Sequence, residues 1–286
     1  MILLPLWVFL TLSPANTAEG IMLRVAINQD RAQEMRTAFV YHQNVMVRLQ
    51  RKNGKLAREE YAEFTVTPGA KGVEREQTLF RGKYVEHGKE VAFDKSGFEH
   101  KGIDIDADFA KSLLDDFGND KESRDGVDHD CFPLTSSEQS KYQFHLEGTE
   151  DYRGTPVYRI TFAPKRKASI YDDDDNGSWE GEVLVDQNEF QPVLVTSALA
   201  WKIPGWVKVI FGTNVQQLGF KVTYKKFDEG LWFPVTYGGE FKLKALFFYS
   251  RRVGLSMQNS GFQRADVASK ISYDGGVPWL LSALIP

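Results

Sequence analysis

The sequence predicts a mainly β protein with few helices, of the α+β class, organised around an antiparallel sheet. Aromatic residues make up 13% of its 286 residues, and aromatic side chains suit the half-buried surface of a pleated sheet. Short runs of alternating apolar and polar residues recur along the chain, with turn residues between them. This succession favours a meander of hairpins over alternating strands and helices.

The first half begins with a predicted helix and continues with a predicted hairpin. We expect the helix over residues 21–39, because apolar residues recur there at helical spacing. Its predicted apolar face consists of Leu23, Ala26, Ile27, Met35 and Ala38. The hairpin turns at Asn53-Gly54, a pair that tolerates positive φ, and its second strand spans 60–67.

The middle of the chain differs in charge. Segment 102–131 contains ten acidic residues and three basic ones. Within it, Phe109, Leu113, Leu114 and Phe117 have the spacing of a short helix over 107–117, and residues 118–130 are polar and typical of a loop. We therefore interpret 102–131 as an acidic insertion of a helix and a loop, after which the sheet resumes at Tyr142.

The second half is predicted to consist of hairpins. Strands are expected over 142–146, 157–163, 182–186, 192–201, 217–227, 231–237 and 240–250. The turns between the last three strands are predicted at 228–230 and at Gly238-Gly239.

Alternation in these strands predicts one apolar and one polar sheet face. The apolar residues, which we take as the candidate ligand-binding surface, are Tyr158, Ile160, Phe162, Leu218, Phe220, Val222, Tyr224, Phe241, Leu243, Phe247 and Tyr249. So wide an apolar face must be covered. The helices either close a dry core over it or leave a cavity that an apolar ligand fills.

Several stretches carry a family resemblance. LRVAINQDRAQEM and TAFVYHQNVMVRL near the start, and GTPVYRITFAP, WEGEVLVDQNEFQPV and GFKVTYKKFDEGLWFPVTYGGEF later, form a pattern of strands and turns. This pattern resembles the LolA/LolB/LppX-like superfamily, the periplasmic lipoprotein- and lipid-carrier fold, over about residues 20–274. The resemblance implies a strongly curved antiparallel half-barrel, helices lidding its concave apolar face, non-covalent binding of acyl chains, and no catalysis.

The two ends of the chain are apolar. Residues 2–12 form an uncharged apolar run, followed by small residues that include Ala15 and Ala18. This pattern is typical of a secretory signal, so we predict a signal peptide over 1–18, with cleavage after Ala15 or Ala18. A single domain over 19–274 and an apolar tail over 275–286 would follow. The expected location is periplasmic or secreted, without an integral membrane segment after signal removal.

Motifs for metals and catalysis are weak. Asp172, Asp174 and Asn176 match the first half of a calcium loop, but position twelve is Val183 where a bidentate acid is needed. An acidic turn explains the segment better. The five histidines form no helical zinc pair, and His129-Asp130-Cys131 lies in an acidic region that disfavours a thiolate. We therefore expect no catalytic residues, no metal and no cofactor.

Charge constrains the partners. The net charge of −4 argues against nucleic acid. Residues 201–252 nevertheless contain nine basic and three acidic residues, with Lys221, Lys225, Lys242 and Lys244 on the polar sides of their strands. These lysines either meet an anionic partner or protect sheet edges from aggregation.

These observations favour a non-enzymatic carrier for a lipid, acylated or other long apolar ligand in the bacterial cell envelope. A dry-core envelope module that docks a protein partner is the first alternative. A secreted hydrolase is the second.

Overall fold

The computed structural model describes residues 17–69, 72–100, 104–116, 132–166, 178–201, 215–216, 218–227, 230–245 and 249–265. These ranges contain three helices, α1 (Ala18–Arg36), α2 (Ile105–Asp116) and α3 (Ser136–Gln139). They also contain twelve strands: β1 (Phe39–Arg51), β2 (Leu56–Gly69), β3 (Gly72–Glu86), β4 (Lys89–Phe93), β5 (Tyr142–Tyr152), β6 (Thr155–Pro164), β7 (Ser178–Asp186), β8 (Pro192–Trp201), β9 (Val215–Gln216), β10 (Gly219–Lys226), β11 (Trp232–Ala245) and β12 (Tyr249–Arg264).

All described strands belong to one antiparallel sheet. Its order is β4-β3-β2-β1-β12-β11-β10-β8-β7-β6-β5, and the short β9 pairs with β11. The first and last strands therefore meet inside the sheet, where β1 pairs with both β2 and β12. Within the described part of the chain, β4 and β5 are the two edges and do not pair with each other.

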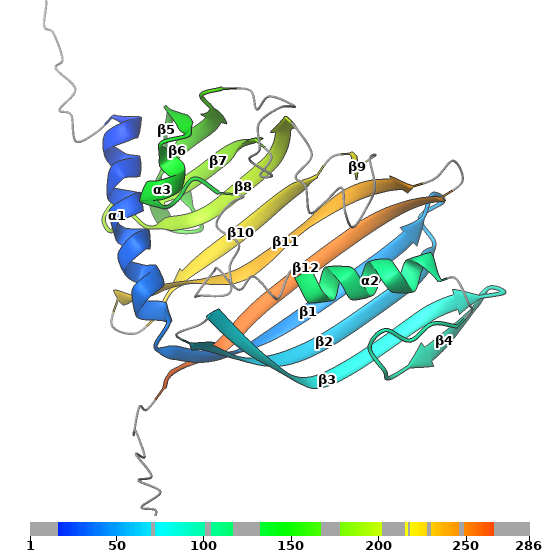
Figure 1. Ribbon diagram of the computed structural model, residues 1–286. Helices are drawn as coiled ribbons and strands as arrows, with labels where there is room; N and C mark the ends of the chain where they lie inside the picture. The colour runs from blue at the N-terminus through cyan, green and yellow to red at the C-terminus, as the bar shows by residue number, and fades with distance from the viewer. Residues whose placement is uncertain are drawn as a thin grey trace, which may run out of the picture.

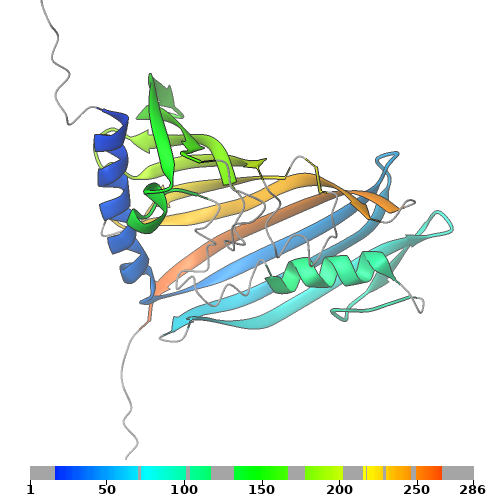
Figure 2. The ribbon, with the colours of Figure 1, turned by 45° about the horizontal axis from the view of Figure 1, so that its top comes forward.

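The sheet curves, and its helices lie on one side of it (Figure 1). Figure 2 shows the same arrangement from a second direction, with α2 over the β1–β2 end and α1 beside the β5–β8 end. We call the helix-bearing side the inner face and the opposite side the outer face. The predicted fold class, a mainly β protein with a curved antiparallel sheet and few helices, is confirmed.

The acidic segment proves to belong to the connection between the two edges of the sheet. Residues 94–141 link β4 at one edge to β5 at the other. On the way, α2 packs on β1 and β2, and α3 packs on α1 and β5. The short helix predicted over 107–117 is confirmed as α2. The loop predicted over 118–130 lies outside the described residues.

Helix α1 is confirmed, but the face predicted to be buried is wrong at most of its positions, since only Ala26 of the predicted residues is buried. The exposed positions include Leu23, Ile27 and Met35. The buried face is formed by Ala18, Ile21, Met22, Val25, Ala26, Gln29, Ala32 and Arg36. Apolar residues occur on both sides of this helix, so spacing alone did not identify the side that packs. Two polar residues lie on the buried side because each finds a partner: Gln29 Nε2 donates to Gln191 Oε1 at 2.6 Å, and Arg36 Nη1 to the Trp232 carbonyl at 2.9 Å.

The turn predicted at Gly238-Gly239 does not exist, because β11 runs through both glycines to Ala245. The reason is a close approach of neighbouring strands. A Cβ on Gly238 would lie 2.4 Å from the carbonyl oxygen of Leu255, and one on Gly239 would lie 2.0 Å from that of Gly219. The glycines permit this packing inside a strand. The predicted strand 240–250 is consequently divided between β11 and β12.

Candidate functional site

The candidate site is the inner face of the sheet. Of the eleven residues predicted for the apolar face, nine are buried: Ile160, Phe162, Leu218, Phe220, Val222, Tyr224, Phe241, Leu243 and Tyr249. Tyr158 is half-buried and packs against the same core, and Phe247 lies outside the described residues. Tyr249 belongs to β12 and not to the strand of Phe241, so the surface extends over more strands than the sequence indicated.

Strand register explains why these side chains share a face. In β10, Phe220, Val222 and Tyr224 are buried and alternate with the exposed Lys221 and the half-buried Thr223. Val222 is directly opposite Tyr237 of β11 and Val195 of β8. Because directly opposite residues of antiparallel strands point to the same side, the alternation in one strand propagates across the sheet.

Aromatic rings line much of this face. Phe220 lies between Trp179 of β7 and Tyr237 of β11, with ring centroids 5.5 Å apart in both pairs. Phe132, from the connection between the sheet edges, meets Tyr237 edge-on at 6.0 Å. Such packed rings supply a large apolar surface with defined geometry.

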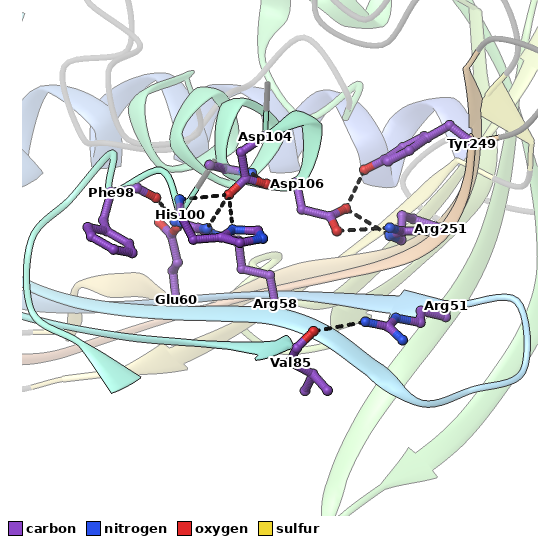
Figure 3. A network of polar contacts seen from close by, with 11 residues as sticks. Arg51, Arg58, Glu60, Val85, Phe98, His100, Asp104, Asp106, Tyr249 and Arg251 are labelled. Carbon is purple, nitrogen blue, oxygen red and sulfur yellow. Dashed lines mark hydrogen bonds and ion pairs between the residues drawn. The ribbon is translucent and has the colours of Figure 1, made fainter. Parts of the chain in front are cut away.

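A buried cluster of charged groups interrupts the apolar surface under α2 (Figure 3). Arg58 and Glu60 of β2 are both 0% exposed. Arg58 Nε lies 2.6 Å from Glu60 Oε1, and its Nη1 lies 3.3 Å from Asp104 Oδ2. The remaining arm, Nη2, donates to the Phe98 carbonyl at 2.6 Å. One arginine thus binds two carboxyl groups and a backbone oxygen.

Asp104 connects this cluster to the helix. Its Oδ1 accepts a hydrogen bond from the Ala107 backbone N–H at 3.2 Å, the contact expected of a residue that caps a helix N-terminus. His100 Nδ1 lies 2.6 Å from Asp104 Oδ2, and the His100 ring stacks on Tyr84 at 4.3 Å. The start of α2 is therefore held against β2 by side chains.

Burial dominates the chemistry of Glu60. Desolvation raises the pKa of its carboxyl group, and this outweighs the opposing effect of the Arg58 guanidinium. Its second oxygen, Oε2, is buried and has no hydrogen-bond partner among the described residues. The protonated form of Glu60 is accordingly favoured relative to an exposed glutamate.

A second ion pair holds α2 against β12 (Figure 3). Arg251 binds Asp106 through two nitrogens, Nε to Oδ1 at 2.7 Å and Nη2 to Oδ2 at 2.8 Å. Tyr249 donates its hydroxyl to Asp106 Oδ1 at 2.6 Å. Burial and then the nearby Asp106 carboxylate raise the pKa of Tyr249, so this hydroxyl keeps its proton and remains a donor.

A further polar group lies on the same face, between β3 and β12. Arg75 Nη2 donates to Gln43 Oε1 at 2.6 Å, and Gln43 donates in turn to Asn259 Oδ1 at 3.1 Å. The Arg75 guanidinium also covers the Phe64 ring, 3.8 Å from its centroid. Burial lowers the pKa of Arg75 to about 10, which leaves it charged at neutral pH.

Sequence reasoning missed these buried charges, although a signal was present. Arg58 and Glu60 alternate with Glu59 and share the periodicity of Ala62 and Phe64, which are buried on the same face. A charged residue at an inward position of a strand pattern needs a partner.

The weaker candidates lie elsewhere. Asp172, Asp174 and Asn176, and the segment His129-Asp130-Cys131, fall outside the described residues. In the part of the chain that the structure describes, no group of three or more His, Cys, Asp or Glu residues could hold a metal ion. None of the helices that it describes is long and apolar enough to cross a membrane.

Comparison with known proteins gives structural matches only. No protein-family model matches the chain, and no curated protein sequence matches it. Matching solved structures include a DUF1329 family protein from Desulfovibrio piger, with 12% identity over 88% of this chain and 94% of that one and a TM-score of 0.37. A putative outer membrane lipoprotein-sorting protein domain from Vibrio parahaemolyticus has 12% identity over 88% and 95%, with a TM-score of 0.36.

A LolA superfamily protein from Nitrosomonas europaea has 13% identity over 89% of this chain and 96% of that one, with a TM-score of 0.32. The resemblance to LolA-like proteins drawn from the sequence thus recurs among the solved structures that match.

Proposed function

We propose that this protein is an exported, non-enzymatic carrier that holds a lipid, an acyl chain or another long apolar ligand on the inner face of its sheet. The observation that carries the proposal is the extent of that face. Its apolar side chains continue from β6 to β12, well beyond the main contacts of α1 and α2 with the sheet, which are to β5, β1 and β2. Because these side chains are buried, a ligand must displace the packing over them.

The chemistry of the face supports an apolar ligand. Rings such as Phe220, Tyr237 and Phe241 offer contact area without charge, and binding through such surface is driven by removal of apolar area from water. The charged groups of the face, Arg58 and Arg251 among them, are bound to carboxylates that hold α2. They are therefore engaged in structure and do not form a polar pocket for a small charged substrate.

The test measures ligand binding directly. Delipidated full-length mature protein is titrated with a fluorescent fatty acid, and protein purified without delipidation is examined by native mass spectrometry for bound lipid. Saturable binding and a lipid mass recovered unchanged are the expected results. Protein that neither binds the probe nor carries lipid would overturn the proposal.

A pair of variants localises the binding. Phe220→Leu with Phe241→Leu reduces the ring surface of the inner face at a cost of about 1 kcal/mol for each volume-reducing apolar change. Thr223→Val alters the outer side of the same strand, β10, where Thr223 bonds Thr236. We expect the first variant to weaken probe binding and the second to leave it unchanged. An equal effect of both would place the ligand elsewhere.

A protein-docking module is the second candidate, and one observation favours it. Leu23 and Ile27 of α1 are 58% and 57% exposed, one helical turn apart. Leu23 borders a hollow of about 460 Å³ between α1, α3 and the edge strand β5. Exposed apolar surface of this kind is typical of partner sites. Leu23→Asp should abolish capture of an envelope protein while leaving fatty-acid binding intact; fatty-acid binding lost with it would argue against a separate docking surface.

A further inference from the structure

The outer face of the central strands has a hollow with glycines at its base, which we call the outer hollow. By alternation with the buried Tyr237, Val253 and Leu255, residues Gly238 of β11 and Gly254 of β12 point outward. Neither has a side chain, and a hollow of about 380 Å³ opens above them. A Cβ on Gly254 would meet only the Arg48 carbonyl oxygen, at 4.0 Å, so the space above this position is open.

The rim of this outer hollow is largely cationic. It is formed by Met46, Arg48, Lys221, Glu240 and Arg252. Arg48 is bound to Glu59 at 2.6 Å. The side chains of Lys221 and Arg252 form no ion pair or hydrogen bond with any residue that the structure describes, and Glu240 is the only acid of the rim.

Strand register adds a like-charge contact beside the hollow. Lys242 of β11 is directly opposite Arg252 of β12, and like charges in directly opposite positions destabilise a sheet. Lys242 also lacks a charged partner among the described residues. An anion bound between these side chains would remove the repulsion.

The sequence left open whether the lysines of β10 and β11 protect sheet edges from aggregation, and their position in the sheet argues against this. Strands β10 and β11 lie in the interior of the sheet, where β8 flanks β10 and β12 flanks β11. Lysines on interior strands protect no edge, so the accumulation of positive charge around the hollow needs another explanation.

We propose that the outer hollow binds a phosphate ester, the group carried by phospholipid headgroups and by soluble phosphate metabolites. Guanidinium and ammonium groups are the usual phosphate ligands. Arg252 and Lys221 line the hollow, and Lys242 lies beside it, directly opposite Arg252. The hollow is larger than a phosphate ion and has the Met46 side chain in its wall, which suits an ester over the free ion. The site lies on the opposite side of the sheet from the inner face and does not rest on the proposed carrier function.

Three variants of the full-length mature protein test this site. Lys221→Gln with Arg252→Gln removes two rim cations. Lys225→Gln with Lys244→Gln removes two exposed cations of the same outer face and neighbouring strands, outside the hollow. Gly254→Val keeps every charge and fills the floor, at a position where the backbone leaves room for the new side chain. Thermal unfolding checks that each variant is folded.

Binding is measured by cosedimentation with vesicles of phosphatidylglycerol and phosphatidylcholine in equal parts, with pure phosphatidylcholine vesicles as the neutral reference. Calorimetric titration with glycerol phosphate is the soluble arm. Loss of the two rim cations should weaken binding about 30-fold. Gly254→Val should also weaken it, whereas the Lys225/Lys244 variant should bind like wild type.

Each outcome has a defined meaning. Binding of anionic vesicles without glycerol phosphate identifies the source as a membrane headgroup, and binding of glycerol phosphate identifies a soluble ester. Equal weakening by both double variants, with Gly254→Val unaffected, would show diffuse attraction of a basic surface and overturn the site. Binding of neither ligand by the wild-type protein would also overturn it.

Discussion

Among the described residues, Arg58 is the only cation bonded to Glu60, and Arg58 and His100 are the only side-chain partners of Asp104. Replacing Arg58 by methionine removes this cation and leaves Asp104 with His100. The wild-type arginine is fully buried and bonds Glu60 Oε1, Asp104 Oδ2 and the Phe98 carbonyl. Methionine fills a similar volume but bonds none of them. Breaking a buried ion pair by removing one partner costs about 3–5 kcal/mol, and we expect Arg58→Met to lower the free energy of unfolding by this amount at pH 7.

The loss should depend on pH with a definite sign. The folded-state pKa of Glu60 already lies above its ordinary value of 4.5. A raised carboxyl pKa contributes stability that is complete below the unfolded-state value and is lost as pH rises through the folded-state value. Without Arg58 the protonated form is favoured still more. The penalty of Arg58→Met should therefore be largest at neutral pH and shrink as the pH falls toward 4.5.

Urea unfolding of both proteins between pH 4.5 and 7.5 provides the measurement. Arg48→Met is the matched control, because Arg48 is about half exposed and pairs with Glu59 at the surface of the adjoining strands, and surface pairs contribute about 0–1 kcal/mol. The double variant Arg58→Met/Glu60→Leu should recover part of the loss, since it removes the stranded carboxylate. An Arg58→Met penalty no larger than that of Arg48→Met, or one that grows as the pH falls, would refute the reasoning.

Three further predictions concern α2, the glycines of the sheet and the start of α1. Asp106→Asn removes the carboxylate that binds Arg251 and Tyr249. Amide hydrogen exchange in α2 should therefore accelerate more than the global free energy of unfolding falls, and unchanged exchange would show that this pair does not hold the helix. Gly238→Ala should destabilise by about 1–3 kcal/mol through overpacking against the next strand, and Gly254→Ala should be nearly neutral in the same thermal unfolding assay; equal effects would contradict the geometry. Thr17 caps α1 by accepting a hydrogen bond from the Gly20 N–H at 3.1 Å. Signal cleavage after Ala15 would retain this cap, so the intact mass should place the mature N-terminus at Asn16. Thr17→Ala should lower the free energy of unfolding by about 1 kcal/mol.

Local patterns predicted a large part of the inner face. The alternation of Phe220, Val222 and Tyr224 with polar neighbours is a property of single strands, and it holds in the folded sheet. The Asn53-Gly54 turn is likewise local, and Gly54 has the expected positive φ of 80°. Features that depend on one strand and its own turn were therefore accessible from the sequence.

Features that depend on distant partners were not. A Gly-Gly pair usually marks a turn, and only the neighbouring strands reveal that Gly238 and Gly239 serve close packing within β11. Burial of Arg58 and Glu60 depends on Asp104, which directly precedes α2 and lies about fifty residues away along the chain. The edge strand β4 is short, and its sequence, KEVAF, has no apolar alternation from which a strand could be predicted. Four of its five residues are exposed in the structure.

Pairing of the first strand with the last has a consequence for how the molecule is made. Phe39 of β1 is opposite Arg264 of β12, so the seam between the two halves of the sheet joins residues from opposite ends of the domain. Contacts so distant in sequence form slowly, because a long chain must be closed before they are gained. β1 can pair with β12 only after nearly the whole domain has left the ribosome. Until then the polypeptide has an incomplete sheet, and a chain in that state is still able to be threaded through a translocation channel.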